Sequence, residues 1–455
     1  MRTGVVAVAL ALLVLAPLLP RRASAQFSFD ARRYGMGGVS LSRDGNVRRY
    51  NPAYRAVKNK NHVAGAPKFS IPVPIGLIDF FKQHPINQLG HDPMFTPESA
   101  AFNPAALLNI IFNPPIFYEV KKAPLPTNDV AFTIGRNQLI IDLGATKVLI
   151  PEQEFGLGTT SRLLDVGVGF AGFNVGVMGF LQYDVGFTLD STLRRFLVSD
   201  STALPNTAYF VNVDGTAQAG FAPTVSYAGR VLRGAGGDET DDGLYLGGAL
   251  HYYLGATYGR GIGPAGFTTG PAPVLGSTPS PLLNGDLFTS NKPFGKGVGG
   301  DVGVVWISGP FEVGAGVNDI GAELTWSHSK IQHFVYDNAG DSIATIVVSS
   351  DTSLKTKLPI TYIGNAALHM GTGTTVGGDV VNSGRGTVIH VGVEQRTGPF
   401  AIRGGVSRDQ RKKMQFGFGG GLRLGPIGLD VGFFTHSNSL STQRAITMAT
   451  AISIY

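Results

Sequence analysis

Three short stretches of the chain bring together side chains of the kinds that catalyse reactions or bind metals. His436, Ser437 and Asn438 are residue types used by hydrolases, but consecutive residues of a strand or turn cannot converge on one substrate atom. The stretch GGDETDDG (236–243) offers carboxylates for calcium, although a solvated acidic turn is the commoner structure. GIGPAG (261–266) fits G-x-G-x-x-G without a βαβ unit, which indicates a flexible loop. We therefore expect no enzymatic activity, no metal and no cofactor.

A fourth stretch, YGMGGVSLSRDGNVRRYNPAYRAV (34–57), has no catalytic pattern but an unusual composition. Its glycines make it a poor helix, and its interruptions make it a poor strand. It stands close behind an apolar N-terminus and ahead of a long, strand-rich region. Its role depends on the elements that surround it.

The N-terminus is typical of a secretory signal peptide. A short basic start is followed by an almost wholly apolar run, Val5 to Leu19, and the small residues Ala23 to Ala25 form a cleavage pattern before Gln26. Pro17 within the apolar run argues against a stable membrane-spanning helix. We expect residues 1–25 to be removed on export. The loss of their three arginines lowers the formal net charge from +6 to +3, which gives no support for a nucleic-acid partner.

The composition of the remaining chain narrows the class of protein. It has no cysteine, so no disulfide can stabilise it after export. Only 15% of the residues are charged, 63 of 455 are glycine, and the mean hydropathy is +0.12. After the signal there is no apolar run of about 18 residues, the length that a spanning helix needs. These features together predict an all-β protein, a transmembrane antiparallel β-barrel of an outer membrane.

Alternating polarity supports this prediction. Between Gly172 and Asp190 two opposite faces are predicted. One face carries Phe173, Val175, Val177, Leu181, Tyr183, Val185 and Phe187, and the other carries Asn174, Gly176, Met178, Gln182, Asp184, Gly186 and Thr188. In 244–258 the predicted outward residues are Leu244, Leu246, Leu250, Tyr252, Leu254 and Tyr258, opposite Tyr245, Gly247, His251, Gly255 and Thr257.

A hairpin is predicted at 298–318 around the turn Ser308-Gly309-Pro310. Its outward face would carry Val298, Val302, Val304, Trp306, Phe311, Val313, Ala315 and Val317. Its inward face would carry Asp301, Gly303, Glu312, Gly314, Gly316 and Asn318. Segments of this kind from about residue 129 to the final AITMATAISIY predict 12 to 16 strands, with about 14 as the central value. We expect the connections 189–206, 233–242, 259–297 and 337–342 to be extracellular loops, and the short Gly-Pro turns to face the periplasm.

Residues 62–128 break the rhythm of the strands. They are rich in proline, and 97–115 can form a short apolar helix that needs a covering surface. Either the barrel lumen or the membrane interface could supply that surface.

The fourth stretch resembles the N-terminal region of the FadL family of outer-membrane transporters. The wider group of FadL-like barrels includes PorV-type and TraF-type proteins. The shared pattern is a glycine-rich start, an acidic residue and Asn-Pro-Ala about fifteen residues on. Here it consists of Gly35, Gly37, Gly38, Asp44, Asn51, Pro52 and Ala53. The resemblance implies an N-terminal hatch (26–61) that plugs the barrel lumen, in which Arg43, Arg48 and Arg49 could pair with inward carboxylates. An ordinary periplasmic tail is the alternative.

The expected organisation is a signal peptide (1–25), a hatch (26–61), a proline-rich insert (62–128) and a transmembrane barrel (129–455). The resemblance implies passive uptake of hydrophobic or amphipathic small molecules, such as long-chain fatty acids, across the outer membrane. The expected partners are therefore the outer-membrane lipid around the barrel and the small-molecule substrate. The alternative function is a PorV-like or TraF-like barrel that docks secreted or envelope proteins. The residues that would bind the substrate are not identified by the sequence.

Overall fold

The computed structural model describes most of the strand-rich region and parts of the N-terminal region. The described residues are 31–39, 47–58, 69–72, 82, 85, 88, 131–135, 138–142, 155–199, 202–234, 236–237, 239–276, 279–291, 294–337, 342–371, 373–384, 386–409, 414–435 and 446–454. The expected signal peptide, Asp44, the expected helix at 97–115 and the triplet 436–438 lie outside these residues. No helix among the described residues is long and apolar enough to cross a membrane.

Short helices are few. They are α2 (Ala31–Gly35), the 3-10 helices η1 (Val47–Arg49) and η2 (Pro52–Ala56), and α5 (Ser191–Val198). A small hairpin consists of β2 (Ala131–Gly135) and β3 (Gln138–Asp142). All other strands belong to a single 16-stranded sheet whose pairings are antiparallel. They are β1 (Phe69–Pro72), β4 (Phe155–Phe170), β5 (Phe173–Leu189), β6 (Ala208–Arg233), β7 (Gly243–Thr268), β8 (Ser280–Ser290), β9 (Gly295–Ser308), β10 (Phe311–Asp337), β11 (Ser342–Lys357), β12 (Thr361–Met370), β13 (Thr374–Ser383), β14 (Gly386–Thr397), β15 (Phe400–Arg408), β16 (Met414–Leu424), β17 (Ile427–Thr435) and β18 (Ile446–Ile454).

The sixteen strands occupy fourteen positions across the sheet. β8 and β9 follow one another between β7 and β10, each pairing with a different part of those two strands. β11 and β12 likewise share the other side of β10, and Pro359 lies in the break between them. Because proline has no amide proton for a ladder, a strand is readily interrupted there. One of these positions is filled by β1, which lies within the expected proline-rich insert and was not predicted as a strand. The strands from residue 129 onward fill the other thirteen positions, two of them with an interrupted strand, which is within the predicted range of 12 to 16.

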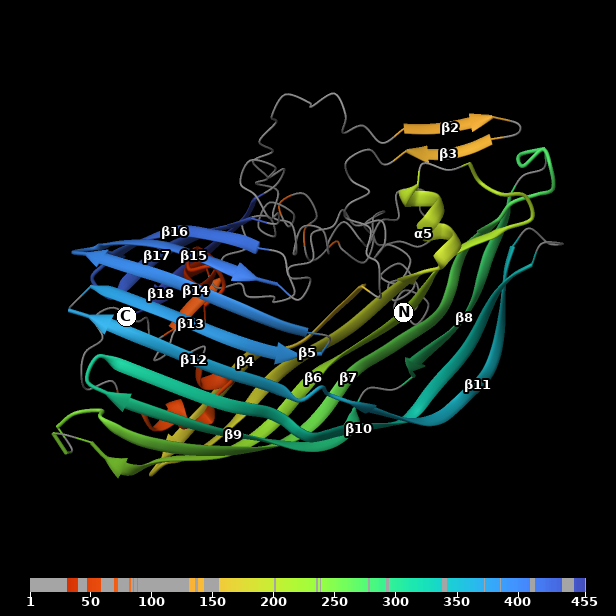
Figure 1. Cartoon of the computed structure of the whole chain (residues 1–455). Coiled ribbons are helices and arrows are strands. Elements are labelled where there is room, and N and C mark those ends of the chain that lie inside the picture. Colours follow the sequence, from red (N-terminus) through yellow and green to blue (C-terminus); the bar gives the residue numbers. More distant parts are fainter. Residues whose placement is uncertain are drawn as a thin grey trace.

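The strands differ strongly in length. β6, β7 and β10 have 26 or 27 residues, whereas β12 to β18 have 9 to 12. At about 3.3 Å per residue the long strands extend roughly 85 Å, far beyond the 9–11 residues that cross a bilayer. In Figure 1 they project to the right past the short strands, and α5 and the β2–β3 hairpin lie at this projecting end.

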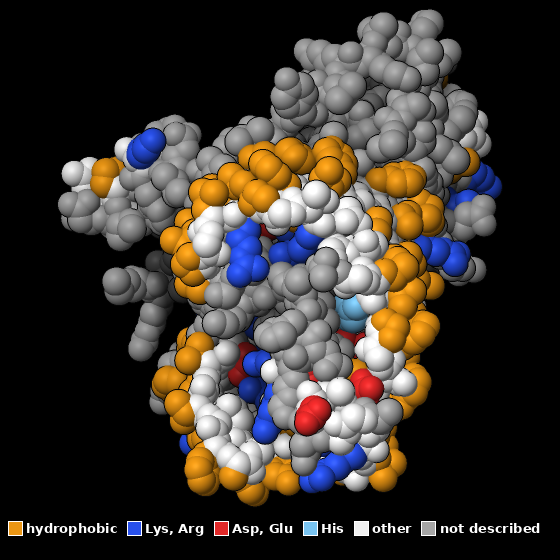
Figure 2. Space-filling view, turned by 90° about the vertical axis from the view of Figure 1, so that its left-hand side faces the viewer, with side chains coloured by type: hydrophobic (Ala, Val, Ile, Leu, Met, Phe, Trp, Pro, Cys, Tyr) orange, Lys and Arg blue, Asp and Glu red, His pale blue; other side chains and the backbone are white. Residues whose placement is uncertain are grey.

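The outward face of the sheet is apolar, as the alternation predicts. Val298, Val302, Trp306, Phe311 and Val313 are all 48–66% exposed. Asp301, Glu312 and Asn318, on the opposite face, are at most 4% exposed. Figure 2 shows hydrophobic side chains around the rim and charged side chains within it.

Strand β5 follows its predicted faces less sharply along its length. Phe173, Val175 and Val177 are exposed, and Met178 and Gln182 are buried, as expected. From Leu181 to Phe187 the predicted outward residues are only half-buried.

The predicted faces of β7 are wrong beyond Gly255. Ala219 of β6 pairs with Thr257 and the next residue, Gly220, with Gly255, so Ala256 is an extra residue. Such a bulge reverses the inward and outward faces of everything that follows. Tyr258 is therefore buried and Thr257 exposed, the opposite of the prediction.

Two predictions about the loops are also wrong. Most of 259–297 is strand, because β7 continues to Thr268 and β8 fills 280–290, so GIGPAG belongs to a strand rather than to a flexible loop. The connection 233–242 lies at the same end of the sheet as the Gly-Pro turn after β9, since the Gly309 amide donates to Asp242 Oδ1 at 2.9 Å. The expectation that these two connections face opposite sides of the membrane therefore fails.

The sheet curls around the N-terminal helices. α2 lies against β15 to β18, while η2 lies against β6, β7 and β9, on the other side of the curl. In Figure 1 these helices, coloured red to orange, are enclosed between the short strands and the near halves of the long ones. The sheet order ends at β1 and β4, and in the described part of the chain no ladder joins these two strands. We call the space on the concave side of the sheet the interior.

Candidate functional site: the N-terminal segment and the interior

The residues 31–39 and 47–58, here called the N-terminal segment, rest on wall glycines. A Cβ at Gly405 would lie 2.2 Å from the Met36 carbonyl oxygen, and one at Gly303 would lie 2.0 Å from Asn51 Oδ1. The wall glycines in such close contact are Gly247, Gly303, Gly392, Gly405, Gly417 and Gly432. Because real Cβ atoms do not approach other heavy atoms this closely, the backbone of the segment reaches the sheet only where the wall has no side chains.

The first half of the segment is a single helical turn followed by a sharp reversal. α2 ends where Gly37 and Gly38 adopt φ of 71° and 98°, the left-handed region that glycine occupies without strain. The Gly38 amide donates to the Arg33 carbonyl oxygen at 2.8 Å, which closes the helix end. The reversal places Gly38 against the ring of His390 on β14, with no room for a Cβ.

Asn51 fixes the second half of the segment. Its side chain is fully buried, and its Nδ2 donates to the carbonyl oxygens of Val304 and Ala315, each at 3.1 Å. Its Oδ1 accepts from the Ala53 amide at 3.0 Å and caps η2, whose first residue is Pro52. Asn51 is therefore buried with its amide paired to backbone groups on two strands of the sheet and within the segment itself.

Apolar packing completes this contact. Tyr54, Val47 and Val57 of the segment form a buried cluster with wall residues, among them Val305 and Ile307 of β9. The Tyr54 hydroxyl accepts a hydrogen bond from Asn365 Nδ2 on β12 at 2.5 Å. η2 is therefore held by both apolar and polar contacts.

Buried ion pairs connect α2 to the short strands. Arg32 binds Glu394 of β14 through two hydrogen bonds of 2.8 and 2.9 Å. Arg403 of β15 binds the same carboxylate at 2.6 Å and also Asp430 of β17 at 2.7 Å. All four side chains are at most 5% exposed. A buried pair of this kind loses stability steeply when one partner is removed, because the other charge remains unpaired.

A second buried cluster spans the interior beside η1. Arg162 of β4 pairs with Asp301 of β9 and, at 3.1 Å, with Asp319 of β10. Since β5, β6 and β7 separate β4 from β9 in the sheet, this pair connects two strands that are not neighbours. Arg162 Nη1 also donates to the carbonyl oxygen of Arg49, in the N-terminal segment, at 2.7 Å.

The same carboxylates have further buried partners. His251 Nε2 lies 2.8 Å from Asp301 Oδ2, and the Tyr253 hydroxyl donates to Asp319 Oδ1 at 2.6 Å. Asp319 itself has φ of 60° at an irregularity in β10, which directs its carboxylate inward. Arg55 of η2 pairs with Asp165 of β4 nearby.

Next to this polar cluster the interior is apolar and aromatic. The buried apolar cluster consists of Met178, Phe180, Ala222, Tyr253, Tyr258, Ala322, Leu324, Trp326 and Leu358. Phe180 meets Tyr253 edge to face at 5.2 Å between ring centroids, and Tyr258 stacks on Trp326 at 5.5 Å. Gln218 of β6 accepts from Thr356 of β11 at 2.7 Å, which again connects strands that are not neighbours in the sheet.

Six of the seven predicted hatch residues are described, and all six lie in the N-terminal segment against the inner face of the sheet. Arg32 and Arg55, which pair with Glu394 and Asp165, were not predicted. The signal that could have found them is the abundance of arginine in this region. Arg49 donates to the carbonyl oxygen of Arg162.

Comparison with known proteins gives a uniform but distant picture. No family model matches the sequence, and no curated protein matches it either. Solved structures that resemble it include the Ralstonia pickettii toluene transporter TbuX (12% identity, TM-score 0.33, covering 72% of this chain and 97% of that one). Others are the CymD monoaromatic hydrocarbon channel (11%, 0.32, 71% and 95%) and the Pseudomonas putida toluene transporter TodX (12%, 0.31, 72% and 94%). The strand pairing of this chain by itself gives the antiparallel sheet described above.

Proposed function

We propose that this protein is an outer-membrane channel for passive uptake of hydrophobic or amphipathic small molecules, closed by the N-terminal segment as a hatch. The observation that carries the proposal is the content of the interior. A separable polar segment fills it at the Gly-Pro-turn end, and a buried aromatic cluster lies next to that segment.

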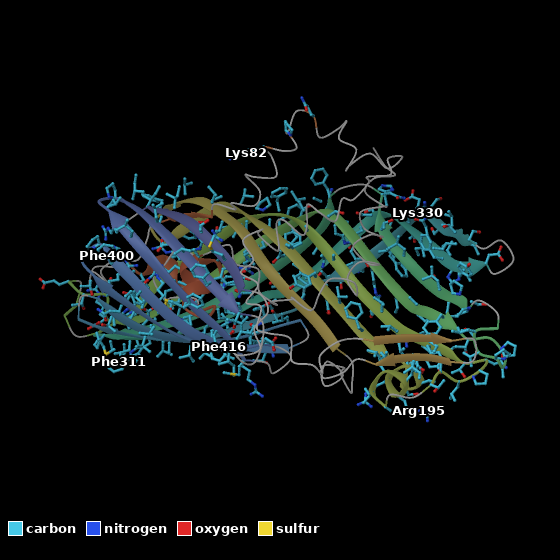
Figure 3. The ribbon with its side chains drawn as sticks, turned by 90° about the horizontal axis from the view of Figure 1, so that it is seen from above. Lys82, Arg195, Phe311, Lys330, Phe400 and Phe416 are labelled. Atoms are coloured by element: carbon cyan, nitrogen blue, oxygen red, sulfur yellow. The ribbon has the colours of Figure 1, made fainter. Side chains whose placement is uncertain are left out.

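The outer surface supports a membrane location. Apolar side chains cover the outward face, and a girdle of aromatic residues surrounds the end with the short turns. It consists of Phe170, Phe173, Tyr227, Trp306, Phe311 and Phe400, which are 48–86% exposed. Figure 3 shows Phe311 and Phe400 at the same end of the molecule. Girdles of aromatic residues at the edges of an apolar band are typical of outer-membrane barrels.

The contacts of the N-terminal segment support a hatch. The segment adds no strand to the sheet and is held by side-chain ion pairs, the Asn51 amide and packing on wall glycines. It can therefore leave the wall without breaking a strand ladder. Ion pairs and amide hydrogen bonds lost on release are replaced by water, which keeps the cost of opening moderate.

The aromatic cluster supports an apolar substrate. A pore that conducts water and ions keeps a polar lining, whereas Phe180, Tyr253 and Trp326 present apolar surface to the interior. An apolar solute gains about 25 cal/mol per Å² when such a surface replaces water around it. Side chains in this cluster would have to move apart to admit a long-chain fatty acid or a compound like it.

Uptake into liposomes tests the proposal. The purified mature chain should carry a fluorescent long-chain fatty acid across the bilayer faster than empty liposomes do, after subtraction of spontaneous flip-flop. It should retain a trapped disaccharide at the same time. Trp326→Ala, which removes the largest side chain of the cluster, should change fatty-acid uptake, and Trp306→Ala on the outer face is its matched control. Fatty-acid flux equal to that of empty liposomes would refute the proposal.

A docking barrel for secreted or envelope proteins is the second candidate. The observation that favours it is the length of β6, β7 and β10, which a small-solute channel does not need. α5 packs there through Phe196 against Tyr209 and Val274, which gives the projecting end a folded surface. A single envelope protein that co-purifies in a fixed ratio, together with absent uptake, would favour this function.

A further inference from the structure

Three lysines meet on the outward face of the sheet where the apolar band ends. Lys296 of β9, Lys355 and Lys357 of β11 are all exposed, and β10 lies between the two strands. Thr325 of β10 pairs with Lys296 on one side and with Lys355 on the other. Neighbouring strands lie about 4.8 Å apart, so Lys296 and Lys355 originate roughly 10 Å from one another, within joint reach of one small anion.

One carboxylate lies among them. Glu323 of β10 contacts Lys355 Nζ at 3.0 Å and Lys357 Nζ at 4.0 Å. Both ammonium groups therefore already converge on one point. Three lysines against one glutamate leave a net charge of +2, which matches the charge of about −1.5 to −2 on a phosphate monoester.

The height of this cluster is that of a membrane interface. Trp306, which belongs to the aromatic girdle, and Lys296 are ten residues apart on β9, about 33 Å along the strand. With a strand tilt of about 40°, this is roughly 25 Å along the barrel axis, the height of the apolar band in outer-membrane barrels. Between the two levels the outward residues are apolar, as Val298 and Val302 show.

The cluster also faces the outer leaflet if the N-terminal segment is periplasmic. It lies at the margin of the band opposite to the Gly-Pro turns and η2, toward the projecting strands. Next to Glu323 the outward side chain is Val298, and beyond it on β7 is Tyr252, 45% exposed. A lipid with its headgroup on the lysines would thus lay an acyl chain on apolar surface.

We propose that Lys296, Lys355 and Lys357 bind the phosphate monoester of an outer-leaflet lipid of the lipid A class. The proposal rests on the proposed function and on an orientation in which the Gly-Pro turns and the N-terminal segment face the periplasm. Glu323 occupies the ammonium groups when no lipid is bound and competes with the phosphate. Lysines at a membrane surface contribute about fivefold in affinity each, so the three together predict roughly 100-fold.

Native mass spectrometry of the full mature chain in detergent tests the proposal with three probes. These are bis-phosphorylated lipid A, the same lipid without phosphates, and inorganic phosphate. The wild type should prefer phosphorylated lipid A, and K296Q/K355Q/K357Q should lose at least tenfold of this preference. Glu323→Gln should bind severalfold more tightly, a gain that misfolding cannot produce. Arg408→Gln, an exposed cation on distant β15, should bind like the wild type.

Three results would overturn the proposal. They are equal wild-type binding of both lipids, wild-type affinity in the triple variant, and displacement of lipid A by millimolar inorganic phosphate. Fatty-acid uptake in phospholipid liposomes without lipid A separates this proposal from the proposed function. In these liposomes the triple variant should transport fatty acid like the wild type. If neither chain transports fatty acid, the channel function is refuted and the lipid site is not.

Discussion

Gly405→Ala should loosen the N-terminal segment while leaving the sheet intact. A Cβ at this position would lie 2.2 Å from the Met36 carbonyl oxygen and 2.7 Å from the Gly37 amide nitrogen. Both are backbone atoms, so the segment as a whole must move by about 1 Å to restore ordinary contact. Overpacking of this kind costs about 1–3 kcal/mol, which shifts the docking equilibrium of the segment by roughly 5- to 150-fold.

Gly404→Ala is the matched control. Gly404 is the adjacent residue of the same strand, and a Cβ there meets no atom within 4 Å. Both variants add one methyl group and both slightly favour the strand, because alanine has less backbone freedom than glycine. The two therefore differ only in the face of the sheet on which the methyl group lies.

The assay is release of a trapped disaccharide from liposomes, with trypsin cleavage of the N-terminal segment as a second readout. Gly405→Ala should leak and be cleaved faster than the wild type, and Gly404→Ala should do neither. The resistance of the folded barrel to SDS at room temperature should be the same in both. Equal leakage from the two variants would refute the reasoning. So would trypsin cleavage of the N-terminal segment in Gly405→Ala at the wild-type rate.

Three further changes test other parts of the structure. Asn51→Ala leaves an amide proton and two carbonyl groups without their partner, which costs the docked segment about 1–3 kcal/mol, so leakage should rise as in Gly405→Ala; wild-type retention of disaccharide would contradict this. Arg162→Met leaves two buried carboxylates facing one another and should cost about 3–5 kcal/mol, seen as a lower temperature of SDS-induced unfolding; an unchanged temperature would show that the ion pair between β4 and β9 does not stabilise the sheet. Leu250→Arg, at a side chain 72% exposed within the apolar band, should cost about 2–4 kcal/mol in lipid, whereas Thr257→Arg beyond the bulge should cost little; equal costs measured by denaturant titration in lipid vesicles would mean that this face does not contact lipid.

The sequence predicts those features that depend on neighbouring residues. The hairpin around Gly309 and the two faces of β9 and β10 follow from alternation, because one face is apolar and the other carries Asp301 and Glu312. The many strand positions from β4 onward follow from the same periodicity, whereas β1 in the proline-rich region was not predicted.

Features that depend on distant residues could not be predicted. Arg32 and Glu394 are 362 positions apart, and Arg162 and Asp301 are 139 apart, so no local pattern brings them together. The bulge at Ala256 reverses a strand through one extra residue whose type gives no signal. Glycines in 259–268 indicated a loop, yet Gly263 and Gly266 lie where a Cβ would meet a carbonyl oxygen of the adjacent strand at 2.2 and 2.0 Å. Glycine there permits close strand contact rather than flexibility.

Removal of residues 26–57 tests the central claim most directly. The truncated chain keeps all sixteen strands of the sheet, so it should still resist SDS and shift in mobility on heating. Reconstituted beside the full mature chain, it should release a trapped disaccharide that the full chain retains. Retention of the disaccharide by the truncated but folded barrel would contradict the account, because the N-terminal segment would then be a tail and not a hatch.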